Sequence, residues 1–294
     1  MPAEGQDRLA EEFETHRSRL RSLAYRMLGS LGEAEDTVQE AWLRLSRTDA
    51  AEIENLAAWL RTVVSRLCLD LLRSRKSHPE DLVGPQIPEQ IPGATGGDDP
   101  EQEAVLADSV GRAMLVVLNA LTPAERVAFV LHDMFAVPFD QIAPIVERTP
   151  VTTKKLASRA RQKVRGTPAA SGAEIARQRQ VVDAFLAASR HGDLAALLAV
   201  LAPDVVRRAD PAALPPGAAA LVRGAQAVAE TTMVFGRRAH LAEAALVNGT
   251  VGIVVAAHGR LAIALLVTVE SDRITAYDVV ADPARLGGLD IAVL

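Results

Sequence analysis

The segment from Arg148 to Arg165 concentrates the side chains best suited to contact nucleic acid. It contains seven Lys or Arg residues and no acid, within a chain of 294 residues whose formal net charge is −5. Thr149 is a good helix N-cap, and Pro150 suits the first helical position because the missing N–H of proline would have no partner there. Lysine and arginine pair with phosphates, while short polar side chains reach base edges. The segment therefore predicts a helix that binds DNA locally.

At about 100° per residue, this helix has one apolar face and one cationic face. The buried face is expected to contain Thr153, Leu156, Ala157, Ala160 and Val164. The opposite face is expected to contain Val151, Lys155, Ser158, Gln162 and Arg165, with Lys154, Arg159 and Arg161 on its flanks. The alternative is that these charges only form a solvated helix face, as most charge runs do.

The preceding residues supply the other helices of a helix-turn-helix. Thr122-Pro123-Ala124-Glu125 has the pattern of a capped helix start. Phe139 to Val146 is predicted to form a short second helix, which Pro144 should strain or shorten because proline lacks an amide hydrogen. In such a unit the last helix enters the major groove, where its first turns face the base edges and its flanking cations contact phosphates.

An acidic surface is predicted on a helix from Glu33 to Leu45. The residues on its outer face are Asp36, Gln39, Glu40 and Leu43, with Glu33 beside them. An exposed leucine among carboxylates is suited to dock a basic partner. A solvated acidic face accounts for the spacing equally well.

The predicted helix from Trp59 to Lys76 carries a second set of cations. They are Arg61, Arg66, Arg73, Arg75 and Lys76. Its buried side is expected to contain Leu60, Val63, Val64, Leu67, Cys68 and Leu71, and its other side Thr62, Ser65 and Leu69. A leucine among cations and small polar residues suits contact with a single strand and its bases, and a solvated face is again the alternative.

Composition defines the organisation of the chain. Residues 78–103 hold five prolines, four glycines and seven acids but no Lys or Arg, so they are predicted to form a flexible linker. The acidic balance argues against indiscriminate coating of nucleic acid. With one cysteine and no metal-ligand spacing, neither an internal disulfide nor a metal site is expected, and a reducing cytoplasm is the default compartment. No signal peptide is expected, because the N-terminal MPAEGQDRLAEEFE has no hydrophobic core. No membrane span is expected, because the apolar run 251–269 is broken by His258-Gly259-Arg260.

From Glu174 the pattern changes to helices followed by apolar or alternating runs. The runs are Ala239–Val247, Val251–Ala257, Leu261–Val269 and Arg273–Val280. Asn248-Gly249, His258-Gly259 and Ser271-Asp272 lie between them and are hairpin signals. Helices followed by a curved antiparallel sheet predict an α+β cone of about a hundred residues.

Three motifs together resemble the extracytoplasmic-function (ECF) RNA polymerase sigma factors of bacteria. They are AEDTVQEAWLRL (34–45), AAWLRTVVSRLCLDLLRSRK (57–76) and LTPAERVAFVLHDMFAVPFDQIA (121–143), within a similarity that runs over residues 8–166. The C-terminal part resembles a SnoaL-like domain of the NTF2-like fold. The resemblance implies a multidomain chain with two all-α domains followed by an α+β NTF2-like cone. The expected bounds are 8–77 for the region 2 bundle, 78–103 for the linker, 104–166 for the region 4 helix-turn-helix and 173–294 for the cone.

By this resemblance the chain binds core RNA polymerase, through the β′ clamp helices and the β flap, and directs initiation at promoter DNA. The polymerase contact is assigned to Asp36, Gln39, Glu40 and Leu43. Opening and holding of the −10 element, with one base turned out of the stack, is assigned to the loop 46–56 and to Arg61, Arg66, Arg73, Arg75 and Lys76. Reading of the −35 duplex is assigned to Val151, Thr152, Lys154, Lys155, Ser158, Arg159, Gln162 and Arg165.

The resemblance also implies that the cone regulates the sigma core in cis, by an intramolecular contact with region 2 and the linker. Gln86-Ile87-Pro88-Glu89-Gln90 is a partial match to a WLPEP-like linker motif. A second, NPDKL-like motif is matched by Ala281 to Leu286, and its assigned residues are Asp282, Pro283, Arg285 and Leu286. A DGGG-type glycine motif is replaced by Arg208-Ala209-Asp210-Pro211, a departure that bears on this regulation and on any ligand.

Two other functions fit parts of the sequence. A one-component regulator would bind an operator with the helix-turn-helix and sense a ligand with the cone, but it leaves the acidic helix and the Trp59–Lys76 surface without a role. A SnoaL-like enzyme fused to a DNA-binding module would need paired acid and base groups. The candidates His240, His258, Asp278 and Asp282 are not paired by their spacing, so no catalytic residue and no cofactor are expected.

Overall fold

The computed structural model describes residues 3–49, 53–77, 110–215, 217–257 and 259–294. The chain divides into an N-terminal unit, residues 1–110 and 118–161, and a C-terminal unit, residues 111–117 and 162–294. The predicted linker 78–103, its partial motif at 86–90 and His258 lie outside the described residues.

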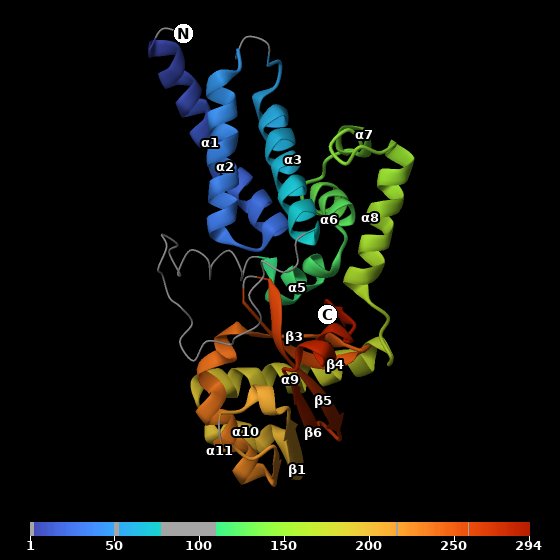
Figure 1. The fold of residues 1–294 in the computed structure, drawn as a ribbon. Coiled ribbons are helices and arrows are strands. Elements are labelled where there is room, and N and C mark those ends of the chain that lie inside the picture. The colour runs from blue at the N-terminus through green and yellow to red at the C-terminus, as the bar shows by residue number, and fades with distance from the viewer. Residues whose placement is uncertain (1–2, 50–52, 78–109, 216, 258) are drawn as a thin grey trace. The chain divides into compact units, whose positions relative to one another are not determined.

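The N-terminal unit begins with three packed helices, α1 (Ala3–Leu28), α2 (Leu31–Arg47) and α3 (Leu56–Ser77) (Figure 1). Gly29, at φ +79°, ends α1 because a left-handed residue cannot continue the helix. The side chain of Ser30 then caps α2 by accepting the amide of Glu33. The inward side of α1 is apolar, and its buried side chains include Leu9, Phe13, Leu20, Leu23, Met27 and Leu28.

A helix-turn-helix follows, as predicted. Its elements are α5 (Arg112–Ala120), α6 (Pro123–Phe129), the π-helix η3 (Val130–Met134), α7 (Phe139–Ile142) and α8 (Pro150–Arg165). The capping box is present at the start of α6: Thr122 Oγ1 accepts from the amide of Glu125, whose carboxylate accepts from the amide of Thr122. The second helix is shorter than the predicted span 139–146, and α7 ends two residues before Pro144, which has no amide hydrogen to extend the ladder.

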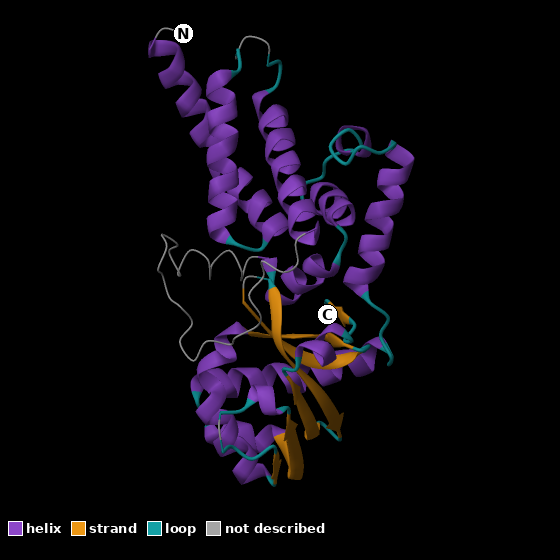
Figure 2. Ribbon diagram, in the orientation of Figure 1, coloured by secondary structure: helices purple, strands orange, loops and turns teal. Residues whose placement is uncertain are grey.

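The C-terminal unit is an α+β domain, and the predicted fold class is confirmed. Its helices are α9 (Gly172–His191), α10 (Leu194–Val200), η4 (Pro211–Ala213), α11 (Ala225–Phe235), η5 (Gly236–Leu241) and α12 (Pro283–Gly287). Its strands are β1 (Leu201–Ala209), β2 (Leu221–Arg223), β3 (Ala242–Val247), β4 (Thr250–Ala257), β5 (Arg260–Glu270), β6 (Arg273–Val280) and β7 (Ile291–Ala292). Figure 2 shows these strands in orange.

The strands form one sheet with the order β2-β1-β6-β5-β4-β3-β7. The expectation of an antiparallel sheet is wrong at one place, because β1 pairs with β6 in parallel, with Arg207 opposite Tyr277. The chain between these two strands includes β2, α11 and the strands β3 to β5, so a long connection separates the two paired strands. The remaining pairs are antiparallel, and Asn248 and Gly249 turn β3 into β4 with φ of +52° and +80°.

Gly249 also connects the cone to the segment between α8 and α9. Its carbonyl accepts the amide of Ala169 at 2.8 Å. A Cβ at this position would lie 2.7 Å from the carbonyl oxygen of Thr167, so both its positive φ and its close neighbour require glycine. The segment 166–172, which connects α8 to α9, is therefore hydrogen-bonded to the cone.

Candidate nucleic-acid interface

Helix α8 presents the predicted cationic face to solvent. The exposed residues of that face are Val151, Lys154, Lys155, Ser158, Arg159, Gln162 and Arg165, whereas Thr152 is half-buried. Thr149 caps the helix by accepting the amide of Thr152 at 3.2 Å. Val151 is 67% exposed, which is unusual for an aliphatic side chain and places an apolar contact in the first turn. The first turns therefore combine apolar, hydroxyl and cationic groups of the kind that read a groove.

The opposite face of α8 is lined by small residues that allow close packing. Thr153, Ala157 and Ala160 are fully buried. Thr153 Oγ1 donates to the carbonyl of Thr149 at 3.0 Å, so this buried hydroxyl has a partner. Leu156, predicted in the same face, is only half-buried. The narrow apolar face predicted from the sequence is present, and it leaves the long cations on the outside.

The π-helix η3 helps to position α8, and no pattern in the sequence indicated a π-helix here. Asp133 in this segment accepts from Arg161 Nε of α8 at 2.5 Å. His132 Nδ1 lies 2.9 Å from the carbonyl of Val137, and its ring stacks on Phe139 with centroids 3.8 Å apart. Arg161 is thus a structural member of the helix, while its neighbour Arg159 faces solvent.

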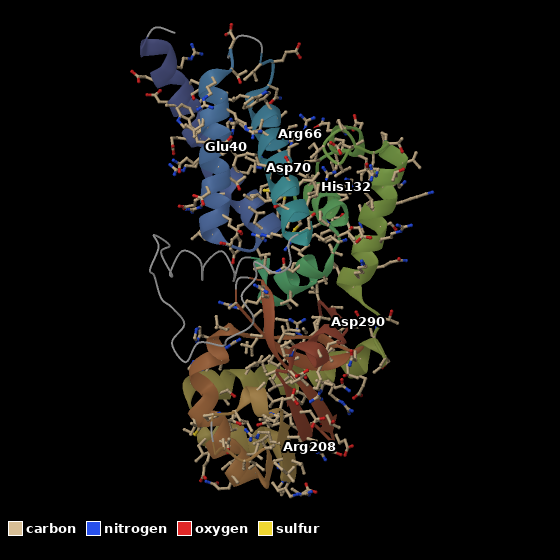
Figure 3. The ribbon with its side chains drawn as sticks, in the orientation of Figure 1. Glu40, Arg66, Asp70, His132, Arg208 and Asp290 are labelled. Atoms are coloured by element: carbon tan, nitrogen blue, oxygen red, sulfur yellow. The ribbon has the colours of Figure 1, made fainter. Side chains whose placement is uncertain are left out.

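The acidic surface predicted on α2 is exposed. Asp36, Gln39 and Leu43 are exposed and Glu40 is half-buried, and Figure 3 places Glu40 on α2. Glu40 accepts from Arg44 Nε at 3.0 Å, a pair one turn apart that contributes little to stability. Leu43 is 40% exposed among these polar groups. The surface keeps the composition of a docking patch for a basic partner.

Helix α3 buries a different face from the one predicted. Ser65 and Leu69, expected on the outer side, are buried, whereas Leu71, expected inside, is 41% exposed. The physical reason is that α3 packs against α1 and α2 and also against α6, so its buried stripe faces two sets of neighbours. The periodicity of apolar residues along one helix does not indicate the second of these neighbouring sets, which is α6. The proposed contact of Leu69 with a DNA strand is therefore excluded in this arrangement.

The cations of α3 are divided between solvent and intramolecular partners. Arg66 and Lys76 are exposed, and Figure 3 places Arg66 on α3. Arg61 donates to Gln141 Oε1 at 2.9 Å, and Arg73 pairs with Glu147 Oε2 at 3.1 Å. Both partners belong to the helix-turn-helix, in α7 and in the turn before α8.

Arg75 differs from its predicted place on the DNA-facing surface. It forms an ion pair with Glu33 and donates to the carbonyl of Leu28 at 3.1 Å. It therefore fixes the junction between α1 and α2, and its charge is already compensated. Cys68 is fully buried nearby, and burial raises the pKa of its thiol, so this cysteine acts as a packing residue.

Two segments of the C-terminal unit lie against each other: residues 208–211, which replace the glycine motif, and residues 281–286, which match the NPDKL-like motif. The Asp210 carboxylate accepts the amides of Ala281 at 3.1 Å and Asp282 at 3.2 Å, and it forms an ion pair with Arg285. Burial acts to raise the pKa of Asp210, but the two amides and the Arg285 charge outweigh it, so the pKa lies below its ordinary value. Asp282 caps α12, Pro283 occupies its first turn and Leu286 is buried. Asp210 thus gives a structural role to the segment that replaces the glycine motif.

The candidate acid and base groups do not converge. Asp278 lies 3.4 Å from Arg208 on the outer side of the sheet, and Asp282 is a helix cap. His240 is exposed. Among the described residues, no group of three or more His, Cys, Asp or Glu could hold a metal ion. None of the helices in the described part of the chain combines the length and hydropathy that crossing a bilayer requires.

The chain is similar to known proteins over nearly its whole length. Two family models match, Sigma-70 region 2 over residues 13–78 and Sigma-70, region 4 over residues 111–164. The ECF RNA polymerase sigma factor SigJ of Mycobacterium tuberculosis is 40% identical over 251 residues, which is 82% of this chain and 79% of the relative. The probable ECF RNA polymerase sigma factor SigI of the same organism is 35% identical over 287 residues, 96% of each chain. The crystal structure of the M. tuberculosis SigJ matches at 34% identity with a TM-score of 0.47, over 95% of this chain and 98% of that one.

Proposed function

The chain belongs to the ECF RNA polymerase sigma factors, which direct core RNA polymerase to promoters, and we propose that it does so with three separate surfaces. The outer face of α8 reads the −35 element, and the acidic face of α2 binds the polymerase. The −10 element is held by the loop before α3 and by the α3 cations Arg61, Arg66, Arg73 and Lys76. The observation that carries this assignment is that α8 exposes a basic face and α2 exposes an acidic face.

For the −35 element, the support is the exposed set on α8. Val151 and Thr152 lie in the first turn of the helix, where groove readers contact bases, and Ser158 follows near the middle of the helix. Lys154, Lys155, Arg159, Gln162 and Arg165 continue the same exposed face towards the C-terminus. Phosphate contacts by these cations would fix the register, and the shorter side chains would supply the sequence preference.

For the −10 element, the proposal requires α3 to give up two contacts. The hydrogen bond from Arg61 to Gln141 and the ion pair of Arg73 with Glu147 occupy cations that DNA would otherwise use. Both contacts are exposed, and exposed pairs contribute about 0–1 kcal/mol each. Promoter DNA can therefore compete for them. Arg66 and Lys76 are already exposed to solvent.

For polymerase binding, the α2 patch of Asp36, Gln39, Glu40 and Leu43 is proposed to meet the β′ clamp helices, and region 4 the β flap. Rim charges steer association and disfavour wrong partners. Because the acidic chain carries only local basic patches, binding to core enzyme would supply the affinity that DNA contacts alone lack.

We propose that the SnoaL-like domain regulates this sigma core in cis. Within the C-terminal unit, the Glu243 carboxylate of β3 accepts the amide of Ala113 at 2.9 Å, at the start of α5. At the other end of region 4, the amide of Val293 donates to the carbonyl of Val164 in α8 at 2.9 Å. Both ends of region 4 are therefore hydrogen-bonded to strands or segments of the cone. The predicted contact with region 2 and the linker remains a proposal carried by the family resemblance.

We retain the domain bounds 8–77, 104–166 and 173–294 as proposals, with action on DNA in the cytoplasm. Members of this family are transcription initiation factors, and we propose that the cone adds no catalytic activity, since its candidate acid and base groups do not converge. A one-component regulator would bind DNA without polymerase, and it would leave the α2 patch without a partner.

The deciding experiment is run-off transcription with purified core enzyme on promoters selected from a random library. The full-length chain is expected to support initiation at defined start sites, and a chain ending at residue 172 is expected to support a different level. Failure of the full-length chain to direct any promoter-specific transcript would refute the sigma function.

A second experiment tests the docking patch. The double variant Asp36→Lys with Glu40→Lys is expected to lose co-purification with core enzyme, because the patch would then repel a basic partner. The matched control is Glu11→Lys with Glu14→Lys, which makes the same charge change at exposed positions of α1. Unchanged core binding by the α2 variant, or equal loss by both variants, would contradict the assignment.

A further inference from the structure

The C-terminal unit contains a partly open cavity of ≈ 130 Å³ between the sheet and its helices. Its walls are mostly apolar and include Phe185, Ile253 and Leu265. Leu214 and Thr232 on its border are half-buried, so this side of the cavity reaches solvent. None of the described residues that line the cavity is acidic.

Arg207 is the charged residue of this lining, and its charge is poorly compensated. Its side chain is 4% exposed. Nη2 donates to the carbonyl of Ala219 at 2.5 Å, but the buried Nε–H has no partner among the described residues. A buried guanidinium with five N–H donors is costly unless an acceptor or a counter-charge is present.

The neighbouring residue follows the ordinary pattern of a strand. Arg208 points to the opposite face of β1, where it lies 3.4 Å from Asp278, and it is labelled in Figure 3. The two adjacent arginines therefore differ in one respect: Arg208 has a carboxylate partner and Arg207 lines an apolar cavity.

The hydroxyl groups of the cavity are already engaged. Ser189 donates to the carbonyl of Phe185 at 2.7 Å, and Thr232 donates to the carbonyl of Val228 at 2.8 Å. Tyr277 lies 3.0 Å from Thr232 Oγ1 and must be the donor of that bond, since the threonine proton is used elsewhere. The Nε–H of the Arg207 guanidinium is left without an acceptor among the described residues.

We propose that this cavity binds a small apolar carboxylate, with the anionic group on Arg207 and the apolar body against the wall of Phe185, Ile253 and Leu265. A guanidinium and a carboxylate form strong charge-assisted hydrogen bonds. An apolar cavity of about 150 Å³ holds a molecule of the size of benzene, which sets the ligand near one ring. A singly charged carboxylate also loses less hydration on entry than a phosphate would.

The test uses the full-length protein without polymerase, so its outcome is independent of the sigma function. Isothermal titration calorimetry compares benzoate with benzamide, which has the same shape and no charge. Benzoate is expected to bind at least about tenfold more tightly, as one charge-assisted hydrogen bond requires. Arg207→Met is expected to abolish this preference, and the control Arg208→Met is expected to keep it.

Equal affinity of the two probes, or no heat from either, would overturn the proposal. So would an Arg207→Met variant that still prefers benzoate. If circular dichroism shows that this variant does not fold, Arg207→Lys takes its place. Lysine keeps the charge but not the fork of donors, so a reduced preference of the same sign is expected. A preference for benzoate that Arg207→Lys leaves unchanged would then exclude Arg207 as the anion partner.

Discussion

Two arginines of α8, two residues apart, separate DNA contact from structural support. Arg159 is exposed, and no ion pair to it is found among the described residues. Arg161 donates to Asp133 at 2.5 Å, and the two side chains are 32% and 23% exposed. We expect Arg159→Ala to weaken −35 binding and Arg161→Ala chiefly to weaken the fold.

The size of the effect follows from counterion release. Each neutralised phosphate changes the slope of log K against log salt by about 0.9. Loss of one contact therefore costs about eightfold in affinity at 0.1 M salt relative to 1 M. For Arg161→Ala, the slope of log K against log salt should change by less than about a third of the value of about 0.9 for a full phosphate contact, because the Arg161 cation is already paired with Asp133. Its free energy of unfolding should fall instead, by about 1–3 kcal/mol, since Asp133 keeps a partly buried charge.

The assay is fluorescence anisotropy of a labelled promoter duplex with reconstituted holoenzyme, at salt concentrations from about 0.05 to 0.2 M. Co-purification with core enzyme and thermal unfolding are measured on the same samples. Equal changes of slope in the two variants, or no change in Arg159→Ala, would refute the assignment of the outer face of α8 to DNA.

Further expectations concern the other contacts. Glu147→Gln removes the ion-pair partner of Arg73 on α3, so run-off transcription should rise by up to about fivefold. The control Asp70→Asn, whose carboxylate lies 3.9 Å from Arg73, should leave transcription unchanged. Asp210→Asn should lower the free energy of unfolding by about 1–3 kcal/mol at neutral pH. Folding lowers the pKa of the Asp210 carboxyl, so its contribution to the free energy of unfolding is present above the unfolded pKa of about 3.9 and is lost as pH falls through the lower folded pKa. Equal differences in unfolding free energy between the wild type and Asp210→Asn at pH 7 and pH 3 would contradict this role. Glu243→Ala should change promoter activity by releasing the start of α5, whereas Glu230→Ala on α11 should not, and identical transcription by both would argue against regulation through that contact.

The helices could be predicted from the sequence because the residues that start and end a helix act locally. Gly29 ends α1, Thr122 and Glu125 form the expected capping box, and Pro144 shortens the second helix of the helix-turn-helix. Such signals act within about four residues, so they survive without knowledge of the rest of the fold. The exposure of the α8 and α2 faces also followed from a single helical period, since each helix has one buried side.

Predictions that depended on distant neighbours were less accurate. The buried face of α3 was wrong at Leu69 and Leu71, because α6 adds a second packing surface that the period of α3 does not encode. The parallel pairing of β1 with β6 was also missed. Hairpin signals identify strands that follow each other, and they carry no information on two strands that pair across a long intervening segment.

The sequence by itself determined where helices begin and end, which of their faces are charged, and the family to which these patterns belong. Only the tertiary structure decided which charged side chains form ion pairs within the protein. It joined Asp210 to Arg285 across 75 residues, paired Arg161 with Asp133, and left Arg207 buried in an apolar cavity with an N–H that has no partner among the described residues. The reason is physical: a charge acquires its role from the groups within hydrogen-bond distance, and folding brings those groups from remote parts of the chain.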